Sequence, residues 1–278
     1  MQIGLAGGVS DIEGCDVMIR VGIGGWVFKP WRGTFYPEGL QQARELEHAS
    51  RAVTTIEING TFYGSQKPES FRRWAAETPD DFVFSLKGPR FTTHRGVLAE
   101  AGPSIERFFA SGVLELKSKL GPVLWQMPPT KALNQEDFAA FLALLPQSLD
   151  GRPLRHVVET RHPSFCVPEY VALMRKSSVA IALIDSEAHP LIADVTGDFV
   201  YARLQRTSEE IATGYPADAL ATWAKRAQTW AAGGAPSDLP TLAPAPRAQA
   251  KRDVFIYMIS GAKAKAPAAA QALLAKLK

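Results

Sequence analysis

The segment VVETRHPSF, residues 157–165, decides the fold. An apolar, β-prone run ends at Glu159, and Arg161 and His162 follow before Pro163 stops the strand. A carboxylate, a guanidinium and an imidazole gathered where a strand ends predict a functional site. Other apolar runs of the chain also end in a polar residue at the matching place. The pattern therefore predicts a set of strands whose polar ends lie together.

Short apolar runs alternate with helical patterns from Met18 onward, which predicts a parallel sheet with crossover helices. About eight such strands close into a TIM-like (β/α)8 barrel of the α/β class, here one domain over residues 18–278. The expected strands are Ile19–Ile23, Val53–Asn59, Phe82–Lys87, Val123–Met127, His156–Arg161, Val179–Asp185, Phe199–Leu204 and Val254–Ser260. The expected helices are Gln41–Arg51, one that starts at Pro68, Ser104–Lys119, one capped by Asn134, Val167–Ser177, Asp218–Ala232 and Pro267–Leu277.

Three segments depart from this alternation. Residues 186–198, between the sixth and seventh strands, show no helical periodicity, so we expect their helix to be short or missing. Residues 233–252 are rich in Pro and Ala and predict a long surface loop inside the domain, because a strand and a helix still follow them. Residues 1–17 precede the first strand and are expected to be a loosely ordered leader.

The composition is that of a globular protein with a large core. The 278 residues are 46% hydrophobic and 21% charged, with a net charge of +3. This mild basic bias fits a small anionic partner and is weak for a nucleic-acid-binding domain. The two cysteines predict a reducing compartment. The chain shows neither a signal peptide nor an apolar run long enough for a membrane span, so we expect a cytoplasmic protein.

Strand alternation predicts which side chains enter the barrel. In the third strand, Phe82, Phe84 and Leu86 share one face, so the opposite face, with Lys87 at its end, should point inward. In barrels of this kind, catalytic groups lie at the mouth formed by the carboxyl ends of the strands. The same reasoning brings to this mouth Glu57, Asn59, Gln126, Glu159, Arg161, Asp185 and Arg203.

Glu57 and Glu159 are the candidate catalytic pair, in which one carboxyl could donate a proton while the other stays ionised. The alternative is a structural network of ion pairs, because charges inside a barrel must be paired. A divalent metal such as Mg2+ is a further alternative, although the neighbouring cations compete for the carboxylates. No metal ligand or other cofactor is assigned. The candidate substrate-binding residues are Trp26, Asn59, Lys87, His94, Gln126, Arg161, His162, Asp185 and Arg203.

Two of these candidates have an equally simple structural explanation. Trp26 belongs to the aromatic segment GIGGWVFKPWRGTFYP, residues 22–37, whose rings could stack on a ligand or close the barrel end. His162 precedes a proline, so a turn alone could account for it. His48, His156 and His189 give no functional argument.

Several blocks of the chain resemble the YecE-like proteins, a bacterial family with a domain of unknown function. The blocks are GIGGWVFKPWRGTFYP, IEINGTFYG, FSLKGPRFTTH, KLGPVLWQMPP, ETRHPSF and FVYARL. The resemblance covers the chain from about Ile19 and implies a TIM-like barrel, without implying an activity. Family members usually carry a His where this chain has Gln205, and an Asn-rich segment after the eighth strand.

These observations lead to three hypotheses. The first is an acid–base enzyme that acts on a small anionic, phosphorylated or carboxylated, sugar-like substrate. The second is a metal-dependent phosphodiesterase or endonuclease-like protein that acts on nucleic acid. The third is a non-catalytic barrel that binds a small molecule or a partner. Fold alone does not choose among them.

Overall fold

The structure, a computed structural model, describes residues 17–245 and 250–278. In this part of the chain, eight parallel strands close into a barrel in the order β1–β10–β9–β8–β7–β4–β3–β2, which confirms the predicted TIM-like fold. The barrel strands are β1 (Ile19–Gly24), β2 (Thr55–Ile58), β3 (Val83–Lys87), β4 (Leu120–Gln126), β7 (His156–Glu159), β8 (Ala180–Asp185), β9 (Phe199–Leu204) and β10 (Asp253–Met258). Two short antiparallel strands, β5 (Ser148–Leu149) and β6 (Arg152–Pro153), form a separate hairpin.

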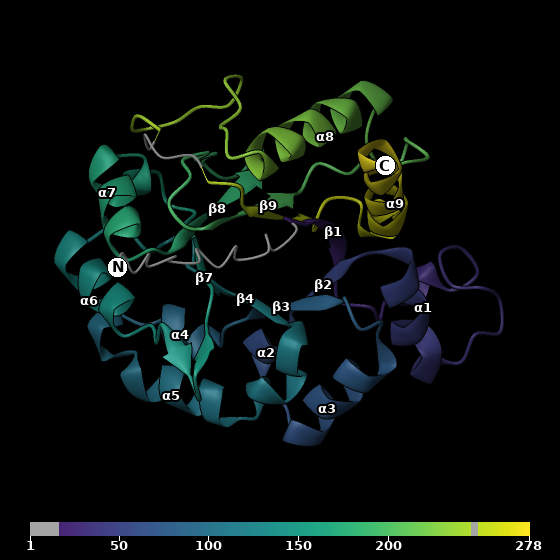
Figure 1. Cartoon of the computed structure of the whole chain (residues 1–278), viewed down its shortest axis with the longest axis horizontal. Coiled ribbons are helices and arrows are strands. Elements are labelled where there is room, and N and C mark those ends of the chain that lie inside the picture. Colours follow the sequence, from purple (N-terminus) through teal and green to yellow (C-terminus); the bar gives the residue numbers. More distant parts are fainter. Residues whose placement is uncertain (1–16, 246–249) are drawn as a thin grey trace, which may run out of the picture.

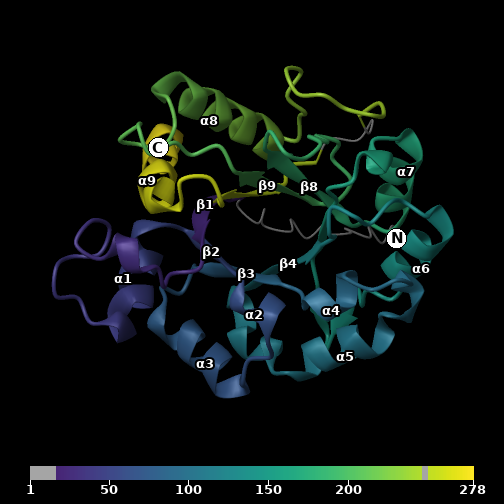
Figure 2. The ribbon, with the colours of Figure 1, turned by 180° about the vertical axis from the view of Figure 1, so that it is seen from behind.

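Helices surround the barrel, as Figure 1 and the reverse view in Figure 2 show. The long helices cover the outer faces of the strands, whereas α2 and α4 are single turns that directly follow β2 and β3. No helix of the described residues is long and apolar enough to cross a membrane. The helices are α1 (Glu45–Ala52), α2 (Gly60–Tyr63), α3 (Pro68–Glu77), α4 (Arg90–Thr93), α5 (Gly102–Ala110), α6 (Gln135–Ala143), α7 (Pro168–Lys176), α8 (Ala217–Ala231) and α9 (Ala266–Leu277).

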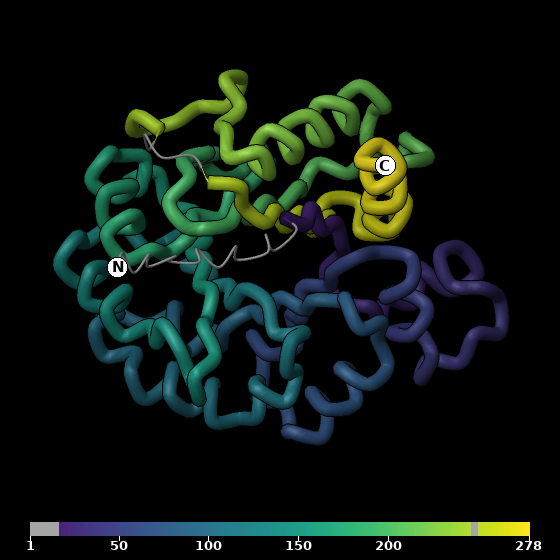
Figure 3. Tube along the Cα trace, viewed as in Figure 1, coloured from purple at the N-terminus to yellow at the C-terminus, as the bar shows by residue number. Residues whose placement is uncertain are grey.

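The first and last strands close the barrel. β1 pairs with β10 in parallel, and the C-terminal helix α9 packs beside α8 and against β1. Figure 3 shows this junction, where the purple start of the trace meets its yellow end. The side chain of Trp31, in the loop after β1, donates a hydrogen bond from Nε1 to the carbonyl of Lys263, 3.0 Å away in the loop after β10.

Two predicted helices differ from the structure in their course. The expected helix 104–119 ends as α5 at Ala110, because Gly112 takes a left-handed conformation with φ of 103°. A 3-10 segment, Val113–Lys119, continues from there. The expected helix 41–51 begins with a 3-10 turn before α1. The absence of a helix in residues 186–198 is confirmed.

The barrel strands separate two cores. One lies between the outer strand faces and the helices, and includes Phe84 and Leu86. The other fills the barrel and includes Tyr201 and Tyr257. The hydroxyl of Tyr201 lies 2.8 Å from the hydroxyl of Ser85, which confirms that the polar face of β3 points inward. The interior of the barrel is therefore packed with side chains, as in other barrels of this class.

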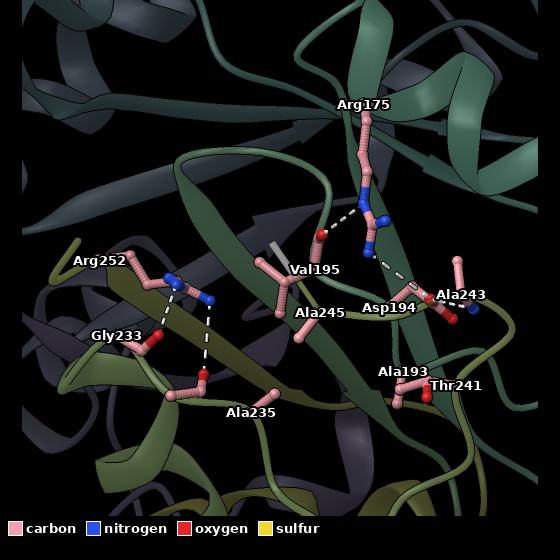
Figure 4. Close-up of a pocket in the computed structure, with 11 residues that line it drawn as sticks. Arg175, Ala193, Asp194, Val195, Gly233, Ala235, Thr241, Ala243, Ala245 and Arg252 are labelled. Atoms are coloured by element: carbon pink, nitrogen blue, oxygen red, sulfur yellow. Dashed lines mark hydrogen bonds and ion pairs between the residues drawn. The ribbon is translucent and has the colours of Figure 1, made fainter. Parts of the chain in front are cut away.

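The described part of the loop at residues 233–252 is hydrogen-bonded to the connection between β8 and β9. The buried carboxylate of Asp194 accepts hydrogen bonds from the backbone N–H groups of Leu242 and Ala243, at 2.7 and 3.0 Å. Arg252 donates to the carbonyl of Gly233 at 2.7 Å. Figure 4 shows the contacts of Asp194 with Ala243 and of Arg252 with Gly233, beside a small pocket of about 20 Å3. The pocket is too small for more than a water molecule.

Candidate active site at the mouth of the barrel

One guanidinium joins the two predicted carboxylates. Arg203, near the end of β9, donates from Nε and Nη2 to the two oxygens of Glu57 on β2, both at 3.0 Å. Its Nη1 donates to Oε2 of Glu159 at the end of β7. All three residues are buried, at 0 to 2% exposure. Such buried charges persist only when paired and hydrogen-bonded, so the three form one electrostatic unit.

Further donors complete this unit. The Tyr201 hydroxyl donates to Glu57 at 2.7 Å. Gln126 and Arg161 both donate to Oε1 of Glu159, at 2.7 and 2.6 Å. Burial alone would raise the pKa of Glu159, but the charges of Arg203 and Arg161 outweigh it and lower the pKa to about 2. Glu159 is therefore ionised at neutral pH and has no proton to donate.

Lys87 ends β3 beside this unit and is bound differently. Its Nζ lies 3.9 Å from the ring centroid of Phe62, in α2, in a cation–π contact. The residue is 5% exposed, and within the described residues its Nζ has no hydrogen bond or ion pair. Burial, with a smaller contribution from Arg203, lowers the pKa of Lys87 to about 8. The ammonium group thus lies at the mouth without a fixed acceptor.

Three polar side chains lie around this centre. Asn59 donates to the carbonyl of Glu57 at 3.3 Å, and the His94 ring meets Phe62 edge-on with centroids 5.6 Å apart. His189 comes from the connection after β8. Burial first, then the charge of Arg161, lowers the pKa of His189.

The predicted inward position of Asp185 is wrong. Along β8, Ala180 and Ala182 belong to the barrel interior, whereas Asp185 pairs with the outward Leu204. Its carboxylate accepts a long hydrogen bond of 3.4 Å from the Tyr215 hydroxyl and lies 3.9 Å from a nitrogen of Arg206. The structure therefore separates Asp185 from Glu57 and Glu159.

Trp26 and His162 are held by structural contacts. Trp26 packs against Trp74 of α3, with ring centroids 5.3 Å apart, and it also contacts Phe84 of the outer core. The Trp26 ring therefore packs on the outer core. His162 accepts a 3.2 Å hydrogen bond from the N–H of Ser164 and caps a 3-10 turn, as the turn explanation predicts.

The sequence did not indicate two participants in this centre. Phe62 lies 25 positions before Lys87, and no local pattern links the two. His189 lies in a segment without periodicity, so alternation gives its side chain no direction. A third, Tyr201, could have been found, because it shares the inward face of β9 with Arg203.

The described side chains at the mouth do not have the arrangement that a metal ion requires. Within residues 17–245 and 250–278, no three His, Cys, Asp or Glu side chains gather closely enough to hold one. The oxygens of Glu57 and Glu159 are occupied by arginine, tyrosine and glutamine donors. The metal alternative therefore gains no support from the geometry.

Fold and site together define a TIM-like barrel with a buried carboxylate–guanidinium unit at its mouth. The chain belongs to the family described as "Protein of unknown function DUF72", whose model matches residues 20–278. The resemblance to YecE-like proteins is thereby confirmed. The family description names no reaction.

Curated relatives match part of the chain. The UPF0759 protein YecE of Escherichia coli K12 is 30% identical over 148 residues, 53% of this chain and 50% of YecE. The UPF0759 protein YunF of Bacillus subtilis is 28% identical over 129 residues, 44% of each chain. The chain thus matches about half the length of these relatives.

Solved structures extend the similarity of fold to nearly the whole chain. A DUF72 family protein of Enterococcus faecalis superposes with a TM-score of 0.69 at 16% identity, covering 94% of this chain and 95% of that one. Another, of Thermotoga maritima, gives 0.68 at 21% identity, with 92% and 97% covered. At these identities the match shows the fold alone.

Proposed function

We propose that the chain is an enzyme that transfers a proton to or from a small anionic substrate at the mouth of its barrel. The main support is the position of Lys87, a buried lysine over the Phe62 ring without a hydrogen-bond acceptor in the described residues. Unlike the guanidinium groups of Arg161 and Arg203, this ammonium group is held by no carboxylate of the described residues, so it is available to a ligand.

The charge balance of the mouth supports an anionic substrate. Lys87, Arg161 and Arg203 supply three cations, whereas the carboxylates of Glu57 and Glu159 supply two anions. An excess positive charge in a partly buried site attracts an anion. A phosphorylated or carboxylated, sugar-like molecule carries such a group together with hydroxyls for polar side chains such as Asn59.

The geometry changes the division of roles between the candidate residues. Glu159 holds Arg203 and Arg161, and its pKa of about 2 makes it a weak base. A pKa of about 8 gives Lys87 both protonation states near neutral pH, which is the condition for efficient general acid–base catalysis. We therefore assign proton exchange to Lys87 and the orientation of the mouth cations to the two carboxylates.

Solvent exchange tests this proposal without knowledge of the product. The protein is incubated in D2O with a panel of phosphorylated and carboxylated sugars, and deuterium incorporation is followed by proton NMR. We expect at least one compound to exchange a C–H proton. Lys87→Arg should keep anion binding and lose about 100-fold or more of the exchange rate, because the guanidinium keeps its proton.

A matched control and two contrary outcomes complete the experiment. Lys225→Arg, at an exposed position of α8, should leave the exchange rate unchanged. Undiminished exchange in Lys87→Arg would remove Lys87 from the reaction. Saturable binding of several compounds with no exchange from any of them would favour the non-catalytic binding barrel.

A further inference from the structure

A groove lies beside the mouth, between the segments that follow β3 and β4. It encloses about 640 Å3, a volume typical of small-molecule sites. The segment after β3 contributes His94, Arg95 and Val97, and the segment after β4 contributes Lys131. Both segments leave the carboxyl ends of their strands, which is the end of the barrel that carries the proposed active site.

The side chains of the groove favour an anion. Arg95 and Lys131 are cationic, and Asp137 is the acidic residue that lines it. Both oxygens of Asp137 already accept hydrogen bonds, from the N–H groups of Leu98 at 3.0 Å and Ala99 at 2.9 Å. The carboxylate is thus used to hold the backbone of the groove wall, and it leaves the two cations available.

Arg95 carries an unused donor. One terminal nitrogen of its guanidinium donates to the carbonyl of Glu100. Its Nε is buried and has no partner within the described residues. The buried Nε cannot reach a molecule in the groove. The other terminal nitrogen makes no hydrogen bond within the described residues and is not buried, so it is the donor left for a bound anion. Lys131 has one acceptor, the carbonyl of Gly96 at 2.8 Å, and its ammonium group retains two further donors.

His94 connects the groove with the mouth. Its ring lines the groove and also packs edge-on against Phe62, the ring that carries the Lys87 ammonium group. A molecule that contacts Lys87 can therefore continue past His94 toward Arg95 and Lys131. The two sets of cations would then hold two ends of one ligand.

We infer that this groove binds a second anionic group of the substrate, so that the substrate is an elongated molecule with an anion at each end. The inference rests on the proposed function, which places the reacting end at Lys87. Bisphosphorylated sugars and phosphorylated sugar acids have this chemistry. The groove would then select such molecules over compounds with a single anionic group.

A series of alkane bisphosphonates measures the distance between the two anion sites. Each bisphosphonate is paired with the monophosphonate of the same carbon number, and both dissociation constants are measured by calorimetry. We expect the bisphosphonate to bind about tenfold or more tightly at one optimal chain length. Arg95→Gln and Lys131→Ala should each reduce this advantage. Lys225→Ala, at an exposed site on α8, should preserve it.

The outcomes separate this inference from the proposed function. If the bisphosphonate and the monophosphonate bind with equal affinity at every chain length, the groove is not a second anion site. The same conclusion follows if both groove variants keep the optimal chain length of the wild type. A length optimum that depends on Arg95 and Lys131, in a protein that exchanges no substrate proton in D2O, supports the groove and overturns the proposed reaction. Proton exchange on a sugar with an anion at each end, at a rate that both groove variants leave unchanged, supports the proposed reaction and overturns the groove.

Discussion

Two lysines of this barrel are buried to nearly the same extent and have opposite surroundings. Lys87 is 5% exposed and Lys119 is 7% exposed. The Nζ of Lys119 donates to the carbonyls of Ala75 and Thr78, at 2.6 and 2.7 Å, and to the Thr78 hydroxyl at 3.2 Å. All three of its donors are used at the C-terminal end of α3, where a cation is favourable.

The ammonium group of Lys87 lies over the ring of Phe62 and has no hydrogen-bond acceptor among the described residues. Both lysines are thus buried, and they differ in whether the protein supplies hydrogen-bond acceptors for the ammonium group. A satisfied buried lysine stabilises the fold. One without a protein acceptor is available to a bound anion. The comparison gives Lys119 a structural role and supports the role proposed for Lys87.

The largest expected effect comes from removal of the satisfied lysine. Lys119→Met should lower the free energy of unfolding by about 2–4 kcal/mol, because it removes three hydrogen bonds at the end of α3 and leaves the Thr78 carbonyl without this donor. Lys87→Met should leave this free energy unchanged or raise it by up to about 2 kcal/mol, since a desolvated charge is removed. Urea unfolding of both variants measures the two values. Equal destabilisation by the two substitutions would contradict the different roles given to Lys119 and Lys87.

The second prediction concerns pH. The pKa of Lys87 is lowered to about 8 from its ordinary value of 10.5, so burial of the charged form destabilises the fold fully below pH 8. Between these two pKa values the unfolded chain binds more protons than the folded one. The contribution of Lys87 to the free energy of unfolding should therefore rise with pH, by at most about 1.4 kcal/mol per unit.

Urea unfolding of the wild type and Lys87→Met at pH 7, 8, 9 and 10 isolates this contribution, because other titrating groups cancel in the difference. The advantage of the methionine variant should narrow as the pH rises. A difference that stays constant from pH 7 to pH 10 would show that Lys87 keeps an ordinary pKa.

The sequence predicted the barrel and most of its mouth for a clear physical reason. Strand alternation in β3 and β9 shows a difference between faces, because polar Ser85, Lys87 and Arg203 alternate with apolar residues. Closure of the barrel then brings such ends together. No comparable pattern in the sequence predicts which residues will contact a buried lysine. Lys119 and Thr78 are 41 positions apart, and only tertiary packing joins them.

Alternation also fails where both faces of a strand are apolar. The run AIALID of β8 packs on the barrel interior through its alanines and on the helices through Ile181 and Leu183. Strands of parallel sheets are commonly apolar on both faces, so the pattern does not reveal which face is inward. The polar end of this strand was assigned inward by analogy with the other strands, and this is the origin of the error at Asp185.

The smallest expected effect is that of Asp185→Asn. Burial raises the pKa of Asp185, with Arg206 acting in the opposite direction, so its charge contributes little to stability. The partner Arg206 is 52% exposed and also pairs with Glu187 at 2.9 Å. The substitution should therefore change the free energy of unfolding by less than about 1 kcal/mol. It should also leave deuterium exchange intact, whereas Lys87→Arg should lower the exchange rate about 100-fold or more. Loss of exchange in Asp185→Asn, with normal stability, would return this residue to the mouth and contradict the outward direction of the β8 side chain.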